Sequence, residues 1–131
     1  MRLLLDSHVL LWWLQDSPRL SRAARRAITS PASSVLVSAV SIWEIAIKLS
    51  IGKLKWKAAA NVTLDQCIQA CGFTELPVTA RHAAAVRDLP PHHGDPFDRM
   101  LISQALTEQL RVVTADLAFH TYGVPLIAGE D

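Results

Sequence analysis

Short apolar runs alternate along the chain with longer segments in which apolar residues recur at helical spacing. The short runs are typical of strands buried in a sheet, and the longer patterns are typical of helices packed on it. We predict strands over 3–5, 35–37, 73–76, 111–114 and 125–128, and helices over 7–15, 41–50, 63–71, 79–89 and 95–109, with one more after Ser21. This order predicts an α/β fold of three α/β/α layers, with a mainly parallel central sheet of about four to five strands.

Polar residues at the predicted helix starts favour these boundaries. Ser21 can accept a hydrogen bond from the first turn of the helix that follows it. Thr63 and Gln66 have the spacing of a capping box, and Asp95-Pro96 joins a capping residue to a proline at the first helical position. The segment 90–94, Pro-Pro-His-His-Gly, is predicted to be an exposed loop.

Composition limits the classes of protein to which the chain can belong. Its 131 residues suit a single domain over 1–131. Half of the residues are apolar and 19% are charged, so we expect a substantial core and no extensive disorder. The net charge is only +1, whereas proteins that grip duplex nucleic acid by neutralising phosphates normally carry a basic excess. Any nucleic acid is therefore expected to be held locally, weakly or with the help of metal ions.

The cysteines and the N-terminal sequence both indicate a cytoplasmic protein. Cys67 and Cys71 lie on one predicted helix, where a disulfide constrains little and a zinc site lacks a second pair of ligands. We expect both to be reduced and buried. The apolar N-terminal segment is interrupted by Asp6 and His8 and is far shorter than the ~20 residues that span a bilayer. Neither a signal peptide nor a membrane anchor is predicted.

Acidic residues follow the predicted strands or begin the predicted helices. Asp6 follows the first strand directly, and Asp116 comes two residues after the fourth strand. Glu44 lies near the start of the helix after the second strand, and Asp98 lies in the first turn of the last long helix. In a parallel sheet, the carboxyl ends of the strands and the starts of the following helices share one edge, where ligands bind. We therefore expect the four acids to gather at that edge.

Four carboxylates at one edge repel one another unless a cation is bound among them. Two unit charges ~5 Å apart cost about 3 kcal/mol at an effective dielectric constant of ~20. Mg²⁺ prefers oxygen ligands and shares its coordination among carboxylates, water and phosphate. One or two such ions activate water and stabilise the oxygen that leaves a phosphodiester. The arrangement therefore favours phosphodiester hydrolysis.

Structural roles also explain three of these acids. Glu44 forms a capping-box pattern with Ser41 and lies one helical turn from Lys48, with which it can pair. Asp98 is favoured by the helix dipole in the first turn, and Asp116 can cap a short helical turn after the fourth strand. The acid that follows the first strand has no evident structural reason to be there, which favours a functional role for it.

Taken together, four segments of the chain resemble the PIN-domain family, and are most like the VapC-type toxins of bacterial toxin–antitoxin pairs. The resemblance covers essentially the whole chain, in order and at suitable spacing. Its most specific parts are Pro-Phe-Asp-Arg and Thr-Ala-Asp. The segments are Leu-Leu-Leu-Asp-Ser-His (3–8), Val-Ser-Ala-Val-Ser-Ile-Trp-Glu-Ile-Ala-Ile-Lys (37–48), Asp-Pro-Phe-Asp-Arg-Met-Leu-Ile-Ser-Gln-Ala (95–105) and Val-Thr-Ala-Asp (113–116).

The resemblance implies that Asp6, Glu44, Asp98 and Asp116 are catalytic and bind one or two Mg²⁺ or Mn²⁺ ions. It implies an endoribonuclease that cuts single-stranded or looped RNA and serves as the toxin of a type II toxin–antitoxin pair. It also implies a homodimer and a small antitoxin protein that lies in an apolar groove. The family usually has Thr after its first Asp, whereas this chain has Ser7, which keeps the hydroxyl.

Several neighbouring residues are candidates for supporting roles. Ser7 and Thr114 can orient carboxylates or waters from behind the metal ligands, although such hydroxyls are as often plain turn residues. Asp95 is expected to cap its helix, with a possible supporting role at the site. Arg99 can contact a substrate phosphate, although a solvated arginine is the simpler interpretation. The histidines 92–93 are interpreted as exposed loop residues rather than metal ligands.

Four tryptophans exceed what the core of such a small protein needs. The helix after the first strand is apolar on nearly every face, so it has more apolar surface than one contact with the sheet can bury. Aromatic residues concentrate at protein interfaces, so we expect a subunit or partner contact there. The tryptophans are Trp12, Trp13, Trp43 and Trp56.

Two other functions also agree with the sequence. A DNA or flap nuclease can use the same acids, but the modest charge and short chain do not favour an enzyme that grips a duplex. A degenerate domain that serves only as a binding scaffold is the other alternative. The intact set of four acids disfavours it, because a scaffold has no need to keep carboxylates that repel one another.

Overall fold

The computed structural model describes residues 1–56 and 62–131. Within them, five strands form one sheet in the order β3-β2-β1-β4-β5, and every pairing is parallel. Each strand lies within one residue of its predicted bounds, which confirms the α/β architecture with a parallel sheet. The strands are β1 (Arg2–Leu5), β2 (Ser34–Ser38), β3 (Thr74–Leu76), β4 (Arg111–Thr114) and β5 (Leu126–Ala128).

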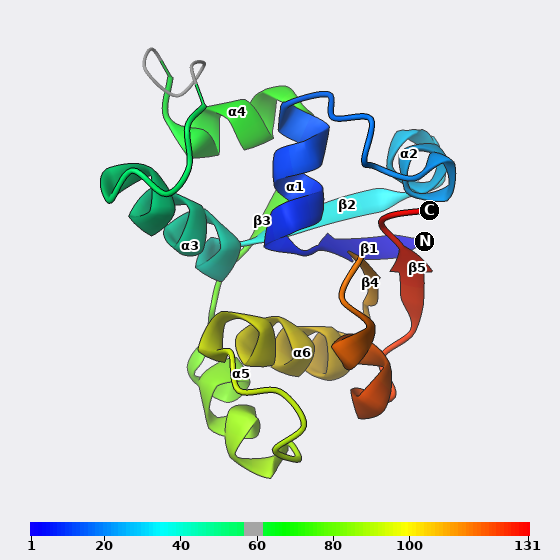
Figure 1. Ribbon diagram of the computed structural model, residues 1–131. Coiled ribbons are helices and arrows are strands. Elements are labelled where there is room, and N and C mark those ends of the chain that lie inside the picture. The colour runs from blue at the N-terminus through cyan, green and yellow to red at the C-terminus, as the bar shows by residue number, and fades with distance from the viewer. Residues whose placement is uncertain (57–61) are drawn as a thin grey trace.

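Helices cover both faces of this sheet (Figure 1). On one face pack α1 (Ser7–Leu14), α2 (Arg22–Thr29) and α4 (Leu64–Ala70), together with part of α3 (Ala39–Ser50). On the other pack α6 (Pro96–Glu108) and the 3₁₀ helix η3 (Leu117–Tyr122), with α5 (Ala80–Ala85) against α6. The helix predicted over 79–89 is thus divided into α5 and a 3₁₀ turn, η2 (Val86–Asp88).

Successive leucines of β1 point to opposite faces of the sheet. Leu3 and Leu5 belong to the core beneath α1, α2 and α4, whereas Leu4 belongs to the core beneath α6 and η3. All three side chains are fully buried, as expected for the central strand of a parallel sheet. The central position of β1 places the residue that follows it, Asp6, at the middle of the sheet's carboxyl edge.

Helix α3 begins earlier than the sequence suggested. Its cap is Ser38, whose Oγ accepts a hydrogen bond from the backbone N of Val40 at 3.1 Å. The predicted capping box of Ser41 and Glu44 is therefore wrong. Ser41 lies inside the helix, and its buried hydroxyl has no hydrogen-bond partner among the described residues. Because α3 begins earlier, Glu44 lies within the helix and its carboxylate does not cap the helix end.

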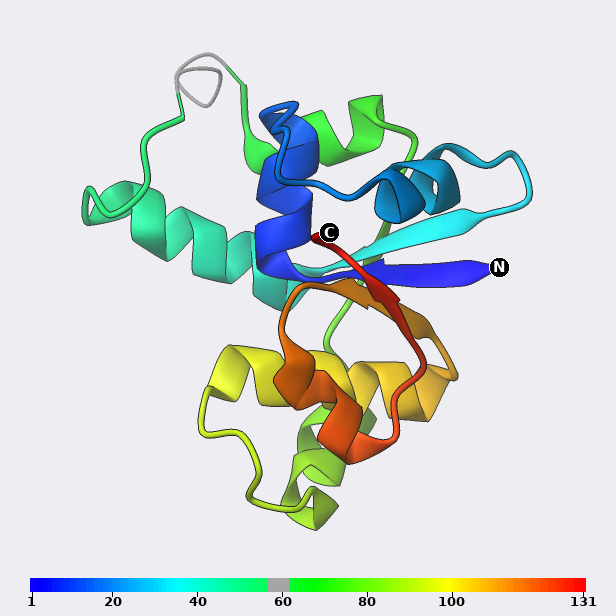
Figure 2. The same ribbon diagram turned by 45° about the vertical axis from the view of Figure 1, so that its right-hand side comes forward.

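The C-terminal tail passes close to the starts of α1 and α2 (Figure 2). The backbone N of Ser21 donates to Gly129 O at 2.8 Å, and the Ser21 hydroxyl donates to Ala128 O at 2.7 Å. Gly129 N in turn donates to Thr114 O at 2.8 Å. A Cβ at position 129 would lie 2.6 Å from Cγ2 of Val9, so this close approach requires glycine.

The tryptophans do not follow the prediction of a partner surface on the first helix. Trp12 is buried in the core, and Trp13 packs against Phe73 with ring centroids 5.8 Å apart. Trp56 is half-buried, whereas Trp43 on α3 is 61% exposed. Much of the apolar surface of α1 is therefore covered within the domain, and the exposed aromatic surface lies on α3.

Two further expectations concern the cysteines and the membrane. Cys67 and Cys71 are free thiols, as expected, but both are half-buried rather than fully buried. Across residues 1–56 and 62–131, no helix combines the length and apolar character needed to cross a bilayer.

Candidate metal centre

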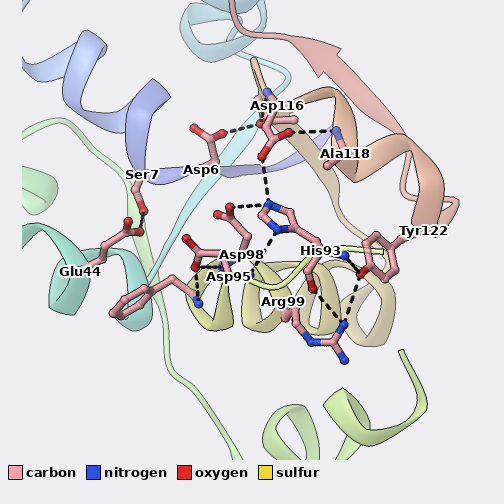
Figure 3. Close-up of polar contacts among 12 residues, drawn as sticks. Asp6, Ser7, Glu44, His93, Asp95, Asp98, Arg99, Asp116, Ala118 and Tyr122 are labelled. Carbon is pink, nitrogen blue, oxygen red and sulfur yellow. Dashed lines mark hydrogen bonds and ion pairs between the residues drawn. The ribbon is translucent and has the colours of Figure 1, made fainter. Parts of the chain in front are cut away.

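The four acids predicted as metal ligands face one region of the molecule (Figure 3). Asp6 lies between β1 and α1, and Asp116 lies between β4 and η3. Glu44 comes from α3, and Asp98 from the first turn of α6. Their charges act on one another, since Asp6 and Glu44 both raise the pKa of Asp98. The carboxyl edge of the parallel sheet thus brings together acids that are far apart in sequence.

Asp6 is held by hydrogen bonds at both of its carboxylate oxygens. Oδ1 accepts from the backbone N of Val9 at 2.8 Å, which caps α1, and Oδ2 accepts from the hydroxyl of Thr114. Burial raises the pKa of Asp6, and the two hydrogen bonds oppose that effect. Asp6 therefore has a structural role as a helix cap, which the sequence analysis did not assign to it.

Glu44 is also buried, and it is paired at both oxygens. Oε1 accepts from the hydroxyl of Ser7 at 2.7 Å, and Oε2 lies 3.0 Å from Nζ of Lys48. The predicted pair of Glu44 with Lys48 is confirmed. Ser7, like Thr114, donates its hydroxyl to an acid, so both residues lie where a hydroxyl fixes the orientation of a carboxylate.

Asp95 and Asp98 share the start of α6. Oδ1 of Asp95 accepts from the backbone N of Phe97 at 2.8 Å and from that of Asp98 at 3.2 Å, which confirms Asp95 as the helix cap. Burial raises the pKa of Asp98 to about 7, and the negative charge of Asp95 adds to this shift. A cation close by would offset the repulsion from the neighbouring negative charges that contribute to this shift.

Asp116 supplies one oxygen to the backbone and turns the other toward the site. Oδ1 accepts from the backbone N of Ala118 at 2.9 Å and caps η3, as the sequence suggested. The backbone N of Asp116 donates to the hydroxyl of Thr114 at 3.0 Å. Thr114 therefore links the backbone of Asp116 to the carboxylate of Asp6.

His93 is a residue of this site that the sequence analysis missed. Its Nε2 lies 2.9 Å from Oδ2 of Asp98 and 3.1 Å from Oδ2 of Asp116. Donor atoms of these three residues all lie within 4.8 Å of one another, so the ring of His93 lies among the acids that would hold a metal ion. His92, by contrast, packs against Tyr122 with ring centroids 5.3 Å apart. The prediction that both histidines are exposed holds for His92 but is wrong for His93, which is half-buried beside the acids.

Arg99 holds the loop that carries His93. Its guanidinium donates to Pro90 O at 2.9 Å and to His93 O at 3.3 Å, and it also contacts the carbonyls of Val86 and Leu89. In Figure 3 it lies on the far side of the loop from the four acids. The expectation of a solvated Arg99 is wrong, and this placement does not favour contact with a substrate phosphate.

The donor set matches a hard divalent cation. The Oδ2 atoms of Asp98 and Asp116 lie on either side of His93 Nε2. The negative charges of Asp6 and Glu44 are close enough to raise the pKa of Asp98. Hard cations such as Mg²⁺ and Mn²⁺ bind carboxylate oxygen in preference to softer ligands. A cavity of about 270 Å³ adjoins the site and is lined in part by Asp116, Leu117 and His120, so a ligand has room beside the acids.

Comparison with known families agrees with this geometry. The family model described as the PIN domain matches residues 3–124. The chain belongs to the PIN-domain family. Ribonuclease VapC22 of Mycobacterium tuberculosis is 35% identical to it over 129 residues, which cover 93% of this chain and 92% of that protein. The resemblance inferred from the four sequence segments is therefore confirmed.

Two solved structures share the fold of this PIN domain. VapBC2 from Rickettsia felis, bound to a DNA fragment from its promoter, superposes with a TM-score of 0.72 at 15% identity, covering 97% of this chain and 98% of that chain. FitAcB from Neisseria gonorrhoeae gives a TM-score of 0.68 at 20% identity, with 97% of each chain covered. At these identities the likeness establishes the α/β fold and its parallel sheet.

Proposed function

We propose that this PIN domain is a metal-dependent endoribonuclease that hydrolyses single-stranded or looped RNA. The observation that carries the proposal is the convergence of four acids, among them Asp98, whose pKa is raised to about 7. The relative that is 35% identical is named a ribonuclease. A divalent cation would offset the mutual repulsion of these carboxylates, and Mg²⁺ or Mn²⁺ suits their oxygen atoms.

Each acid has a distinct place in this proposal. Asp98 and Asp116 present Oδ2 atoms toward one point, so they hold the cation. Asp6, fixed by Thr114, and Glu44, fixed by Ser7, add negative charge beside them. When bound, the cation supplies Lewis-acid stabilisation of the phosphodiester and lowers the pKa of water.

Basic residues on α2, which begins near the carboxyl end of β5, support binding of RNA. Helix α2 has the sequence Arg-Ala-Ala-Arg-Arg-Ala-Ile-Thr, with three arginines and no acid. Its cap, Ser21, donates a hydrogen bond to Ala128 O at the carboxyl end of β5. Ala128 also lines the cavity beside Asp116. Arg22 is exposed and forms no ion pair among residues 1–56 and 62–131. The near-neutral net charge thus conceals a locally basic helix, as expected for a protein that holds RNA over a small area.

The test is cleavage of labelled single-stranded RNA, single-stranded DNA and duplex DNA with Mg²⁺, with Mn²⁺ and with EDTA. We expect RNA to be cut only with the metal, and Asp98→Asn to lose at least ~100-fold in rate, the scale of removing a key electrostatic contact. Asp88→Asn is the control, because Asp88 is an exposed acid on η2. Equal cleavage by the parent and Asp98→Asn would disprove the assignment of the site.

The same assay decides between the alternative functions. Faster cleavage of DNA than of RNA would favour a DNA or flap nuclease on the same acids. An intact, folded protein that cuts none of the three would favour the binding scaffold.

RNA affinity is measured in parallel with the inactive Asp98→Asn protein. Adding Arg22→Ala to the Asp98→Asn protein should make the plot of log RNA-binding constant against log salt concentration less steep, by about 0.7 in slope. Adding Arg81→Ala, on α5, should leave this slope unchanged.

We further propose that the chain is the toxin of a toxin–antitoxin pair and forms a homodimer. Solved structures with this fold include a toxin–antitoxin complex from Klebsiella pneumoniae as well as VapBC2 and FitAcB. A nearly wholly apolar groove of about 280 Å³ lies beside the exposed Trp43, bordered by Val78 and Met100. Homodimer interfaces are more apolar than transient ones, so we assign this groove to a second copy of the chain.

A second groove suits the antitoxin. It lies between α3, α4 and β3, has a volume of about 270 Å³, and combines apolar Ile42 and Phe73 with polar Asp65 and Glu75. Mixed surfaces of this kind are typical of partners that also exist apart.

The test of the homodimer concerns the groove beside Trp43. Light scattering of the chain alone should give a dimer that Trp43→Glu converts to a monomer. A monomeric parent would contradict the assignment of the Trp43 groove.

A further inference from the structure

The loop 90–94 holds the ring of His93 in the centre of the site. The backbone N of His93 donates to Oη of Tyr122 at 2.8 Å, and that hydroxyl donates to Pro90 O at 2.9 Å. Arg99 donates to the carbonyls of both Pro90 and His93. The ring itself packs edge-on against Phe119, with centroids 6.4 Å apart. These contacts from α6 and η3 fix the direction in which the imidazole points.

The hydrogen bond at the other ring nitrogen determines the position of the imidazole proton. Nδ1 of His93 accepts from the backbone N of Asp95 at 3.3 Å. A nitrogen that accepts a hydrogen bond carries a lone pair, so in the neutral ring the proton is on Nε2. Nε2 therefore donates toward Asp98 and Asp116 and has no lone pair to offer a metal ion. His93 in this arrangement is not a ligand.

The Nε2–H group instead contacts the same two oxygens that we assign to the cation. Its distances to Oδ2 of Asp98 and of Asp116 are 2.9 and 3.1 Å. A positive hydrogen shared between two carboxylates reduces their mutual repulsion, as a cation does. A divalent ion that binds these oxygens competes with both contacts.

We propose that His93 is a positioning residue that stands in for the cation: its Nε2–H holds Asp98 and Asp116 together until a divalent ion displaces it. The inference rests on the proposed function, because it requires a cation at these acids. Two consequences distinguish it from a ligand role. Removing the ring should destabilise the metal-free protein, and it should strengthen metal binding because the ion no longer competes with Nε2–H.

The experiment is titration calorimetry with Mn²⁺, together with thermal melts in EDTA and in millimolar Mn²⁺. His93→Ala should bind Mn²⁺ roughly tenfold more tightly than the parent, the effect of about 1.4 kcal/mol of lost competition. It should also melt at a lower temperature than the parent in EDTA, with much of the difference removed by Mn²⁺. His93→Gln should behave like the parent, because an amide N–H can take the place of Nε2–H.

Matched variants separate the possible failures. His92→Ala should leave both the Mn²⁺ affinity and the metal-free melting temperature nearly unchanged, since His92 contacts Tyr122 rather than the acids. Weaker binding by His93→Ala would show that His93 is a ligand, and unchanged binding would show that it does not occupy the place of the ion. Either result would overturn the inference and leave the nuclease proposal intact. A parent that binds Mn²⁺ no better than Asp98→Asn would overturn both.

Discussion

Replacing Asp98 with Asn should stabilise the metal-free protein while it removes catalysis. Asp98 is negatively charged above its pKa, and it lies in a partly buried position near Asp95, Asp6 and Glu44. Asn keeps the shape and an oxygen that accepts from His93, but it removes the charge that burial and these neighbours disfavour. Stability and function are therefore expected to conflict at this position.

The direction and size of the change in the free energy of unfolding follow from the pKa of Asp98. Burial and the neighbouring acids raise the pKa of Asp98 from 3.8 to about 7, so between these values the folded protein binds more protons than the unfolded chain. The free energy of unfolding of the parent therefore falls as the pH rises from about 4 to about 7, and then levels off. At about 1.4 kcal/mol for each pKa unit, the upper limit is about 4 kcal/mol. Solvent screens this partly exposed carboxyl, so we expect about 1–3 kcal/mol.

The assay is a series of thermal melts in EDTA from pH 5 to pH 8.5. Asp98→Asn should melt above the parent by about 3–10 °C at pH 8 and by much less at pH 5. Asp88→Asn, which removes an exposed charge, should follow the parent at every pH. Millimolar Mg²⁺ should raise the melting temperature of the parent and should do much less for Asp98→Asn. A parent whose stability does not fall between pH 5 and pH 7, or an Asp98→Asn variant no more stable at pH 8, would refute the reasoning.

Two other predictions test the supports of the site. Asp95→Ser should keep most of the activity and stability because serine also caps helices, whereas Asp95→Ala should lose about 1 kcal/mol in urea unfolding; a large loss of activity in a folded Asp95→Ser protein would instead make Asp95 catalytic. Gly129→Ala should lose about 1–3 kcal/mol because its Cβ would meet Val9 Cγ2 at 2.6 Å and backbone atoms at 3.1 Å. Gly94→Ala, with open space around position 94, is the control, and equal unfolding midpoints for these two variants would contradict the packing argument.

The elements and acids that depend on local sequence could be predicted. The run Leu3–Leu5 is too short and too apolar for anything but a buried strand, so the position of Asp6 at its carboxyl end followed from the chain alone. The cap at Asp95 was equally local, because Pro96 fixes the first turn of α6. Parallel pairing then brings such positions to one edge, whatever their separation in sequence.

Features that depend on distant contacts could not be predicted. Both Ser38 and Ser41 are good caps, and the choice of Ser38 depends on β2 continuing to pair with β3 through that residue. His93 was missed because its partner Asp116 is 23 residues away and its loop is held by Arg99. A histidine beside prolines carries no local signal of such a contact. Its only hint in the sequence is its position two residues before the cap at Asp95.

Two acids of the site, Asp6 and Asp116, also cap helices, and this shared role fixes the directions of their side chains. One oxygen of Asp6 caps α1 while the other meets Thr114, and one oxygen of Asp116 caps η3 while the other turns to His93. Asp98 lies in the turn that Asp95 caps. When a backbone N–H holds one carboxylate oxygen, the second oxygen of that side chain has little freedom to move. The conformational entropy of the side chain is therefore lost on folding rather than on binding of a cation. At Asp6 and Asp116, substitution by Ala therefore removes a cap together with a charge, whereas Asn removes the charge and keeps an oxygen that can cap the helix.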